Sequence, residues 1–156
     1  MTGRIEEGKR LRVIFSAVKL AYEMRDLGFQ KTAYAKILRE TIHFVWEIRE
    51  IPKRSRYRLR SKAALGVPLS ELEYDHAIPM RVVIEMILTN WPDKRQVEWV
   101  LRNMVRGVLI TKEEHNSLRD KKLSSAMPDG WGGQDWTARY RMAGIELADQ
   151  EGMKAQ

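Results

Sequence analysis

The segment Val108–Asn116 constrains the fold most, because it joins two kinds of secondary structure at a marked boundary. Its first three residues, Val108–Ile110, form a short apolar run of the kind found in buried strands. Thr111 followed three residues later by Glu114 is a capping box, which marks the start of a helix. The chain is therefore expected to have an α+β fold in which a buried strand leads directly into a helix.

A second short segment, Leu72–Pro79, places the acid Asp75 beside the imidazole of His76. An acid next to an imidazole offers a metal ligand and a general base from two consecutive positions. A further imidazole, His115, lies in the first turn of the helix that Thr111 caps, where a ligand can face the preceding strand. These residues are the ingredients of a metal-dependent phosphodiesterase.

The pattern Asp-His-x-x-Pro, followed by a strand, a threonine N-cap and a histidine four residues after that threonine, resembles the ββα-metal core of the His-Me finger (HNH) nucleases. The resemblance covers roughly residues 74–119. It implies one divalent metal ion (Mg, Mn, Ni or Zn) held by Asp75 and His115, with help from Asn116. It also implies that His76 takes the proton of the attacking water, and that the substrate is nucleic acid, with double-stranded DNA favoured over RNA.

The chain departs from the family pattern in three places. Residues 79–103 predict two helices where many members have a short loop. Arg106 stands near the place of the central asparagine, and Arg119 stands where some members carry a second ligand on the helix. This thin ligand set keeps a second interpretation open: a non-catalytic nucleic-acid- or protein-binding accessory protein, of phage or mobile-element type, that retains an HNH-like fold. A helical adaptor for an acidic protein is a weaker third interpretation.

The net charge of +7 is unevenly distributed along the chain. Residues 1–62 hold 16 Lys or Arg against 7 Asp or Glu, whereas residues 63–156 hold 12 against 14. The segment Lys53–Lys62 has six cations and no acid. An extended backbone there would place alternate arginines on one face, a row that, with Lys62, suits a phosphate backbone. A solvated basic linker is the equally weighted alternative. The arginines of this row are Arg54, Arg56, Arg58 and Arg60.

Apolar residues at helical spacing predict most of the remaining structure. They indicate one helix up to Leu27 and a second from about Thr32 to Glu50. Two more helices follow Pro79 and are expected to brace the two strands from outside. His43, in the second helix, is a candidate third ligand, although a lone helical histidine is more often structural. Residues 123–136 predict a loop, because they are rich in Pro, Gly and Asp.

These elements predict a mainly α member of the α+β class with three parts. They are a basic helical region (1–62), an HNH-like ββα-metal core with a helical insertion and a C-terminal loop and helix (63–147), and a polar tail (148–156). The absence of cysteine excludes disulfides and cysteine-type zinc knuckles. We expect a cytoplasmic protein, since there is no apolar signal core and no run of membrane-spanning length. One site cuts one strand, so a double-strand break would require a homodimer or a protein partner.

Overall fold

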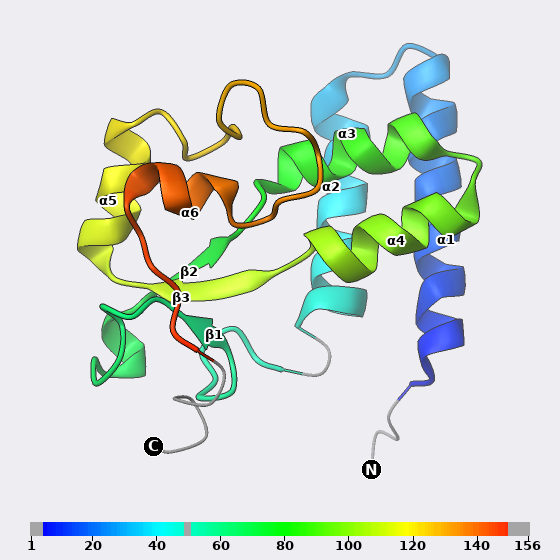
Figure 1. Cartoon of the computed structure of the whole chain (residues 1–156). Coiled ribbons are helices and arrows are strands. Elements are labelled where there is room, and N and C mark those ends of the chain that lie inside the picture. Colours follow the sequence, from blue (N-terminus) through cyan, green and yellow to red (C-terminus); the bar gives the residue numbers. More distant parts are fainter. Residues whose placement is uncertain (1–4, 49–50, 150–156) are drawn as a thin grey trace.

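The computed structural model describes residues 5–48 and 51–149, and it is mainly helical with a small three-stranded sheet at one end (Figure 1). This confirms the expected α+β class with a predominance of helix. The elements in chain order are α1 (Glu7–Asp26), α2 (Lys31–Thr41), the π-helix η1 (Ile42–Glu47), β1 (Leu59–Arg60), the 3₁₀ turn η2 (Leu69–Glu71), β2 (Glu73–His76), α3 (Met80–Asn90), α4 (Lys94–Met104), β3 (Gly107–Ile110), α5 (Lys112–Asp120) and α6 (Ala138–Ala143).

Helices α1 to α4 share one apolar core, which forms the right half of the molecule in Figure 1. Each helix contributes a stripe of fully buried side chains, such as Val18 on α1, Leu38 on α2 and Ile87 on α3. The pair α3 and α4 therefore packs against α1 and α2 rather than bracing the strands, which differs from the expectation. The same core joins helices on both sides of the boundary expected at residue 62.

The sheet has the strand order β1-β3-β2, with β1 parallel and β2 antiparallel to the central strand β3. Asp75 is paired with Val108, and His76 is paired with Gly107. Because side chains alternate along a strand, Tyr74 and His76 share one face of β2 while Asp75 lies on the other. Helices α5 and α6 cover the Asp75 face through a core that includes Val108, Ile110, Leu118 and Tyr140.

The junction between β3 and α5 forms as its sequence predicts. Thr111 Oγ1 accepts a hydrogen bond from the Glu114 N–H at 3.1 Å, and Glu114 Oε2 accepts one from the Thr111 N–H at 2.9 Å. This capping box satisfies two of the free N–H groups at the helix start. Ser61, just after β1, also donates to Glu114 Oε2 at 2.6 Å, so the cap ties α5 to the edge of the sheet.

The second predicted helix ends differently from its expected form. Helix α2 stops at Thr41 and continues as the π-helix η1, in which the Ile48 N–H donates to the His43 carbonyl five residues back at 3.0 Å. Arg49 and Glu50, expected in this helix, lie outside the described residues. Single π-helical turns are rare and often occur at functional sites, so η1 is a candidate position for functional side chains.

The C-terminal part folds back onto the sheet. The predicted loop 123–136 leads into α6, and the left-handed Gly144 (φ 74°) ends that helix. Ala148 donates its N–H to the Arg60 carbonyl at 2.8 Å, which fixes this part of the chain to β1; residues 150–156 lie outside the described part. Among the described residues, no helix is both long enough and apolar enough to cross a bilayer.

Candidate functional site

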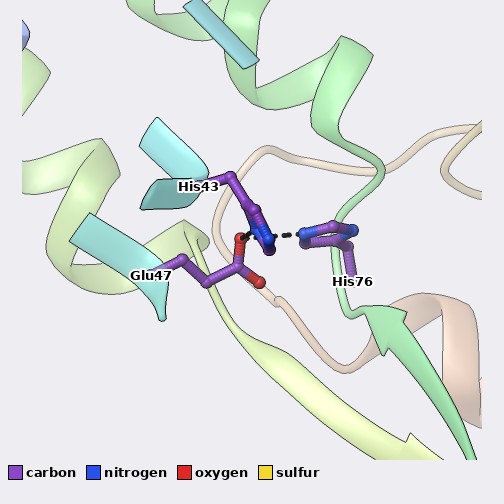
Figure 2. A group of neighbouring side chains, drawn as sticks. All are labelled: His43, Glu47 and His76. Carbon is purple, nitrogen blue, oxygen red and sulfur yellow. Dashed lines mark hydrogen bonds and ion pairs between the residues drawn. The ribbon is translucent and has the colours of Figure 1, made fainter. Parts of the chain in front are cut away.

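Three titratable side chains that are distant in sequence meet between η1 and the end of β2 (Figure 2). His43 and Glu47 come from η1, and His76 is the last residue of β2. Glu47 Oε2 lies 3.1 Å from His43 Nδ1 and 2.9 Å from His76 Nε2. The Glu47 side chain is only 1% exposed, whereas His76 is 28% exposed. The group thus has a buried acid on its inner side and an imidazole that solvent can reach.

The protonation of this group follows from its hydrogen bonds. An ionised carboxylate only accepts, so the two ring nitrogens that face Glu47 must both carry hydrogen. When the His76 ring is neutral, its other nitrogen, Nδ1, has a free lone pair, and no hydrogen bond to Nδ1 occurs within the described ranges. Burial raises the pKa of Glu47, but the hydrogen bonds from His76, Tyr74 and His43 and the charge of His76 outweigh it and hold this pKa at about 2. Glu47 is therefore ionised at neutral pH.

Tyr74 completes the shell of Glu47 from the same face of β2. Its hydroxyl donates to Glu47 Oε1, and its ring lies 5.5 Å from the His76 ring between centroids. To reach Glu47 the phenol crosses Gly107, where an added Cβ atom would overlap the Tyr74 ring and hydroxyl. Burial and the Glu47 charge raise the pKa of Tyr74, so it stays a neutral donor. Glycine at position 107 is thus what allows Tyr74 to approach.

Arg58 fixes the chain segment beside this cluster. Its guanidinium donates to the Pro52 carbonyl at 3.1 Å, to the Glu47 carbonyl at 3.2 Å and to the Ile51 carbonyl, and it lies 5.2 Å from the centre of the Tyr74 ring. Arg58 is buried. It therefore satisfies carbonyls at and beyond the end of η1 and holds the backbone from which the Glu47 side chain projects.

The extended arginine row expected from the sequence does not form. The chain turns between Lys53 and Arg58, so the four arginines do not share one exposed face. Arg58 and Arg60 are buried, and in the described part of the chain Arg60 Nε has no hydrogen-bond partner. Only Arg54 and Arg56 remain exposed from the row, together with Lys62, which pairs with Glu146 at 2.6 Å.

Asp75 has its own partners on the opposite face of β2. Its Oδ2 accepts hydrogen bonds from Arg139 Nη2 and, at 2.7 Å, from the Tyr140 hydroxyl. Arg139 also donates to the carbonyls of Ala77, Leu123 and His76, and is 1% exposed. Burial raises the pKa of Asp75, and the charge of Arg139 and the Tyr140 hydrogen bond oppose this rise. Asp75 is thus part of a buried ion pair that ties β2 to α6.

The remaining predicted ligands lie on α5. His115 and Asn116 are exposed near its N-terminal end. The charge of His115 also lowers the pKa of Asp75, against the larger effect of burial, so the two side chains are close enough to interact electrostatically. They do not belong to a group of three converging ligands; within the described ranges the group that does converge is His43, Glu47 and His76, whose ligand atoms all lie within 4.8 Å of one another.

Sequence reasoning singled out His76 and weighed His43, but it did not find Glu47 or Tyr74. The available signal was the spacing of His43 and Glu47, since side chains four residues apart meet on one helical face. Comparisons of the chain with protein-family models, with curated proteins and with solved structures each gave no match. The residues described above are therefore the basis for a functional proposal.

Proposed function

We propose that this chain is a metal-dependent nucleic-acid phosphodiesterase, an HNH-like endonuclease in which His76 is the general base. The observation that carries the proposal is the contact between His76 Nε2 and the buried, ionised Glu47, 2.9 Å apart at the end of β2. A partly exposed imidazole held by an acid is the arrangement that general-base catalysis needs. The order of β2, β3 and α5, with an antiparallel pair of strands leading into a helix, is compatible with a ββα-metal core.

Glu47 acts in this proposal as a positioning residue. It fixes the ring of His76 and leaves Nδ1 free to accept a proton from water. When His76 takes that proton, the ring becomes an imidazolium, and the negative charge of Glu47 stabilises it, much as the third member of a catalytic triad does. Tyr74 holds the second oxygen of Glu47, which keeps the carboxylate in place.

The cation required by the family resemblance would be held by Asp75 and His115, with Asn116 beside them. In the described part of the chain Asp75 Oδ1 accepts no hydrogen bond, and the two α5 residues are exposed. This sparse oxygen and nitrogen set suits a hard ion that keeps several of its waters. Once bound, such an ion supplies Lewis-acid stabilisation of the charge that develops on the phosphate.

The charge distribution supports a polyanionic substrate. Residues 1–62 carry the whole positive excess, and Arg54 and Arg56 are exposed near the cluster in sequence. A recess of about 380 Å³ between α2 and α3 adds further cations, and its lining includes Lys31, Lys36, Arg39 and Arg81. Such cations favour phosphate contacts that do not depend on sequence. Double-stranded DNA remains the favoured substrate by resemblance, and a double-strand break would require a second copy or a partner.

The direct test is cleavage of supercoiled plasmid by the full chain with Mg²⁺, Mn²⁺ or Ni²⁺. His76→Ala should lower the rate by at least ~10², the usual loss for a general base. Exposed Ser70→Ala serves as a control for handling and purity. Glu47→Gln should also lower the rate, because it keeps the volume but removes the charge.

The alternative function is a nucleic-acid- or protein-binding module without catalysis. The buried ion pair of Asp75 favours it, since an acid engaged by Arg139 and Tyr140 is a poorer ligand. If the native chain cleaves neither DNA nor RNA with any of the three ions, the nuclease proposal fails. Salt-dependent binding of the same nucleic acids would then support the binding module.

A further inference from the structure

The ligand atoms of His43, Glu47 and His76 have the composition of a transition-metal site. Two imidazole nitrogens and one carboxylate oxygen converge from η1 and β2, as Figure 2 shows. We propose that these three residues bind a divalent transition-metal ion such as Zn²⁺, at a site separate from Asp75 and His115, and that this ion switches off His76 as a base. The binding part of the proposal stands alone, and the inhibitory part rests on the proposed function.

The observed distances are close to those of a bound ion. With zinc about 2.0–2.2 Å from each N and O ligand, two ligands of a tetrahedral site stand about 3.3 Å apart. Glu47 Oε2 is 3.1 Å from His43 Nδ1 and 2.9 Å from His76 Nε2. These atoms would have to separate by only a few tenths of an ångström. The third pair, the two imidazole nitrogens, lies within 4.8 Å, so the two rings would also have to turn towards a shared ion.

The surroundings favour three protein ligands with one open position. Glu47 and His43 are 1% and 12% exposed, so they form the inner wall, while the partly exposed His76 ring leaves a side from which water can complete the coordination. The Tyr74 hydroxyl binds Glu47 Oε1, which holds the carboxylate from behind and leaves Oε2 for the metal. Imidazole ligands suit Zn²⁺, Ni²⁺ and Co²⁺ better than Mg²⁺, which prefers oxygen.

Binding at this site would change the tautomer of His76. In the metal-free state Nε2 carries the hydrogen and donates to Glu47, which leaves Nδ1 free to accept a proton. A metal ion uses the lone pair of Nε2, so the ring hydrogen must move to Nδ1. A ring with hydrogen on Nδ1 and metal on Nε2 has no lone pair left. The same side chain would therefore be a base without zinc and inert with it.

The binding test uses the full chain stripped of metal, titrated with Zn²⁺ against a chromophoric chelator at fixed pH. One site is expected. His43→Ala should weaken it by at least ~100-fold, because even loss of an outer-shell partner costs about 10–100-fold. His43→Gln, which can still donate to Glu47, guards against a folding defect, and circular dichroism checks both variants. Glu71→Ala, a change to an exposed acid that belongs to neither metal site, is the control and should bind Zn²⁺ like the native chain.

Co²⁺ in the native chain should give the intense visible absorption of a four-coordinate site, and this absorption should be absent in both His43 variants. Three results would overturn the site: no one-to-one binding to the native chain, native affinity in both His43 variants, or an equally weakened affinity in Glu71→Ala. None of them depends on cleavage activity.

The inhibitory part is tested by adding Zn²⁺ to Mg²⁺-dependent cleavage. In the native chain, the cleavage rate with Zn²⁺ should be at least ~10-fold lower than the rate without it. In each His43 variant, the rates with and without Zn²⁺ should be nearly equal. Zinc binding without inhibition would refute the inhibitory part of the proposal and support the binding part. Zinc binding by a chain that cleaves nothing would instead refute the proposed function and leave the site intact.

Discussion

The two faces of β2 carry an acid and a base that are adjacent in sequence but differ in burial. Asp75 lies on the buried face, and His76 lies on the partly exposed face. On one face, Asp75 is held by Arg139, whose three guanidinium nitrogens all donate to buried acceptors. On the other face, His76 has one nitrogen held by Glu47 and the other free on a partly exposed ring. A buried acid paired with a fully hydrogen-bonded arginine stabilises a fold, whereas a held imidazole with one free lone pair can react. The comparison teaches that two residues adjacent on a strand acquire different surroundings, because they project from opposite faces.

The largest expected effect is on the Asp75 face. Arg139→Met should leave Asp75 as an unpaired buried acid and lower the free energy of unfolding by about 3–5 kcal/mol. Arg141→Met is the matched control two residues away, because Arg141 is 73% exposed and its pair with Asp135 should contribute no more than about 1 kcal/mol. Urea denaturation of both variants measures the difference. Equal decreases in the two variants would mean that the ion pair between Arg139 and Asp75 does not stabilise the fold as a buried pair.

On the His76 face, the ionisation of Glu47 should make the free energy of unfolding depend on pH. The pKa of Glu47 is about 2 in the fold against 4.5 for an ordinary glutamate. A lowered pKa contributes stability that is complete above pH 4.5 and is lost as the pH falls towards 2, about 3 kcal/mol here. Glu47→Gln has no such titration, so its free energy of unfolding should decline less over that range. If the free energies of unfolding of the two proteins change in parallel with pH, Glu47 does not have the lowered pKa.

Gly107→Ala tests the approach of Tyr74 to Glu47. The added Cβ would force the phenol away from Glu47 and should cost about 1–3 kcal/mol, since it adds crowding and leaves polar groups unpaired. Tyr74→Phe removes the hydroxyl alone and should cost less, about 1 kcal/mol. Thermal or chemical unfolding ranks the two. A neutral Gly107→Ala would show that Tyr74 has another place to lie.

The smallest effect concerns the exposed cations. Replacing Arg54 and Arg56 by Gln should flatten the plot of log DNA affinity against log salt by up to ~0.9 for each phosphate that is no longer neutralised, with little change in sequence preference. Changing the exposed Arg95, on α4, to Gln serves as the control. An unchanged slope in the double variant would make the segment a solvated linker, and the recess between α2 and α3 would be the next surface to test.

Local signals in the sequence predicted local structure well. The capping box at Thr111 marked the start of α5, and apolar periodicity located the helices, because both depend on neighbours within one or two turns. Strand alternation could also have separated Asp75 from His76, since consecutive side chains on a strand face opposite ways. The resemblance instead placed them in one site, and the hydrogen bonds of Arg139 and Tyr140 to Asp75 have no local signature.

The cluster around Glu47 depends on tertiary structure and was not accessible in the same way. Glu47 and His76 are 29 residues apart, and their contact requires the packing of η1 against β2. The arginine row failed for a related reason. Its alternation assumed an extended backbone, whereas the carbonyls near the end of η1 need partners and draw Arg58 inward. The Glu47 cluster and the inward position of Arg58 therefore both depend on the need of buried polar groups for hydrogen-bond partners.

The most direct test of the account is the tautomer of His76, measured by ¹⁵N NMR of the imidazole nitrogens in the metal-free native chain at a pH where the ring is neutral. The contact with Glu47 predicts hydrogen on Nε2 and a free lone pair on Nδ1, and this preference should weaken in Glu47→Gln. His76 with its hydrogen on Nδ1 in the native chain would contradict the account, because the nitrogen assigned to take the proton would already carry one.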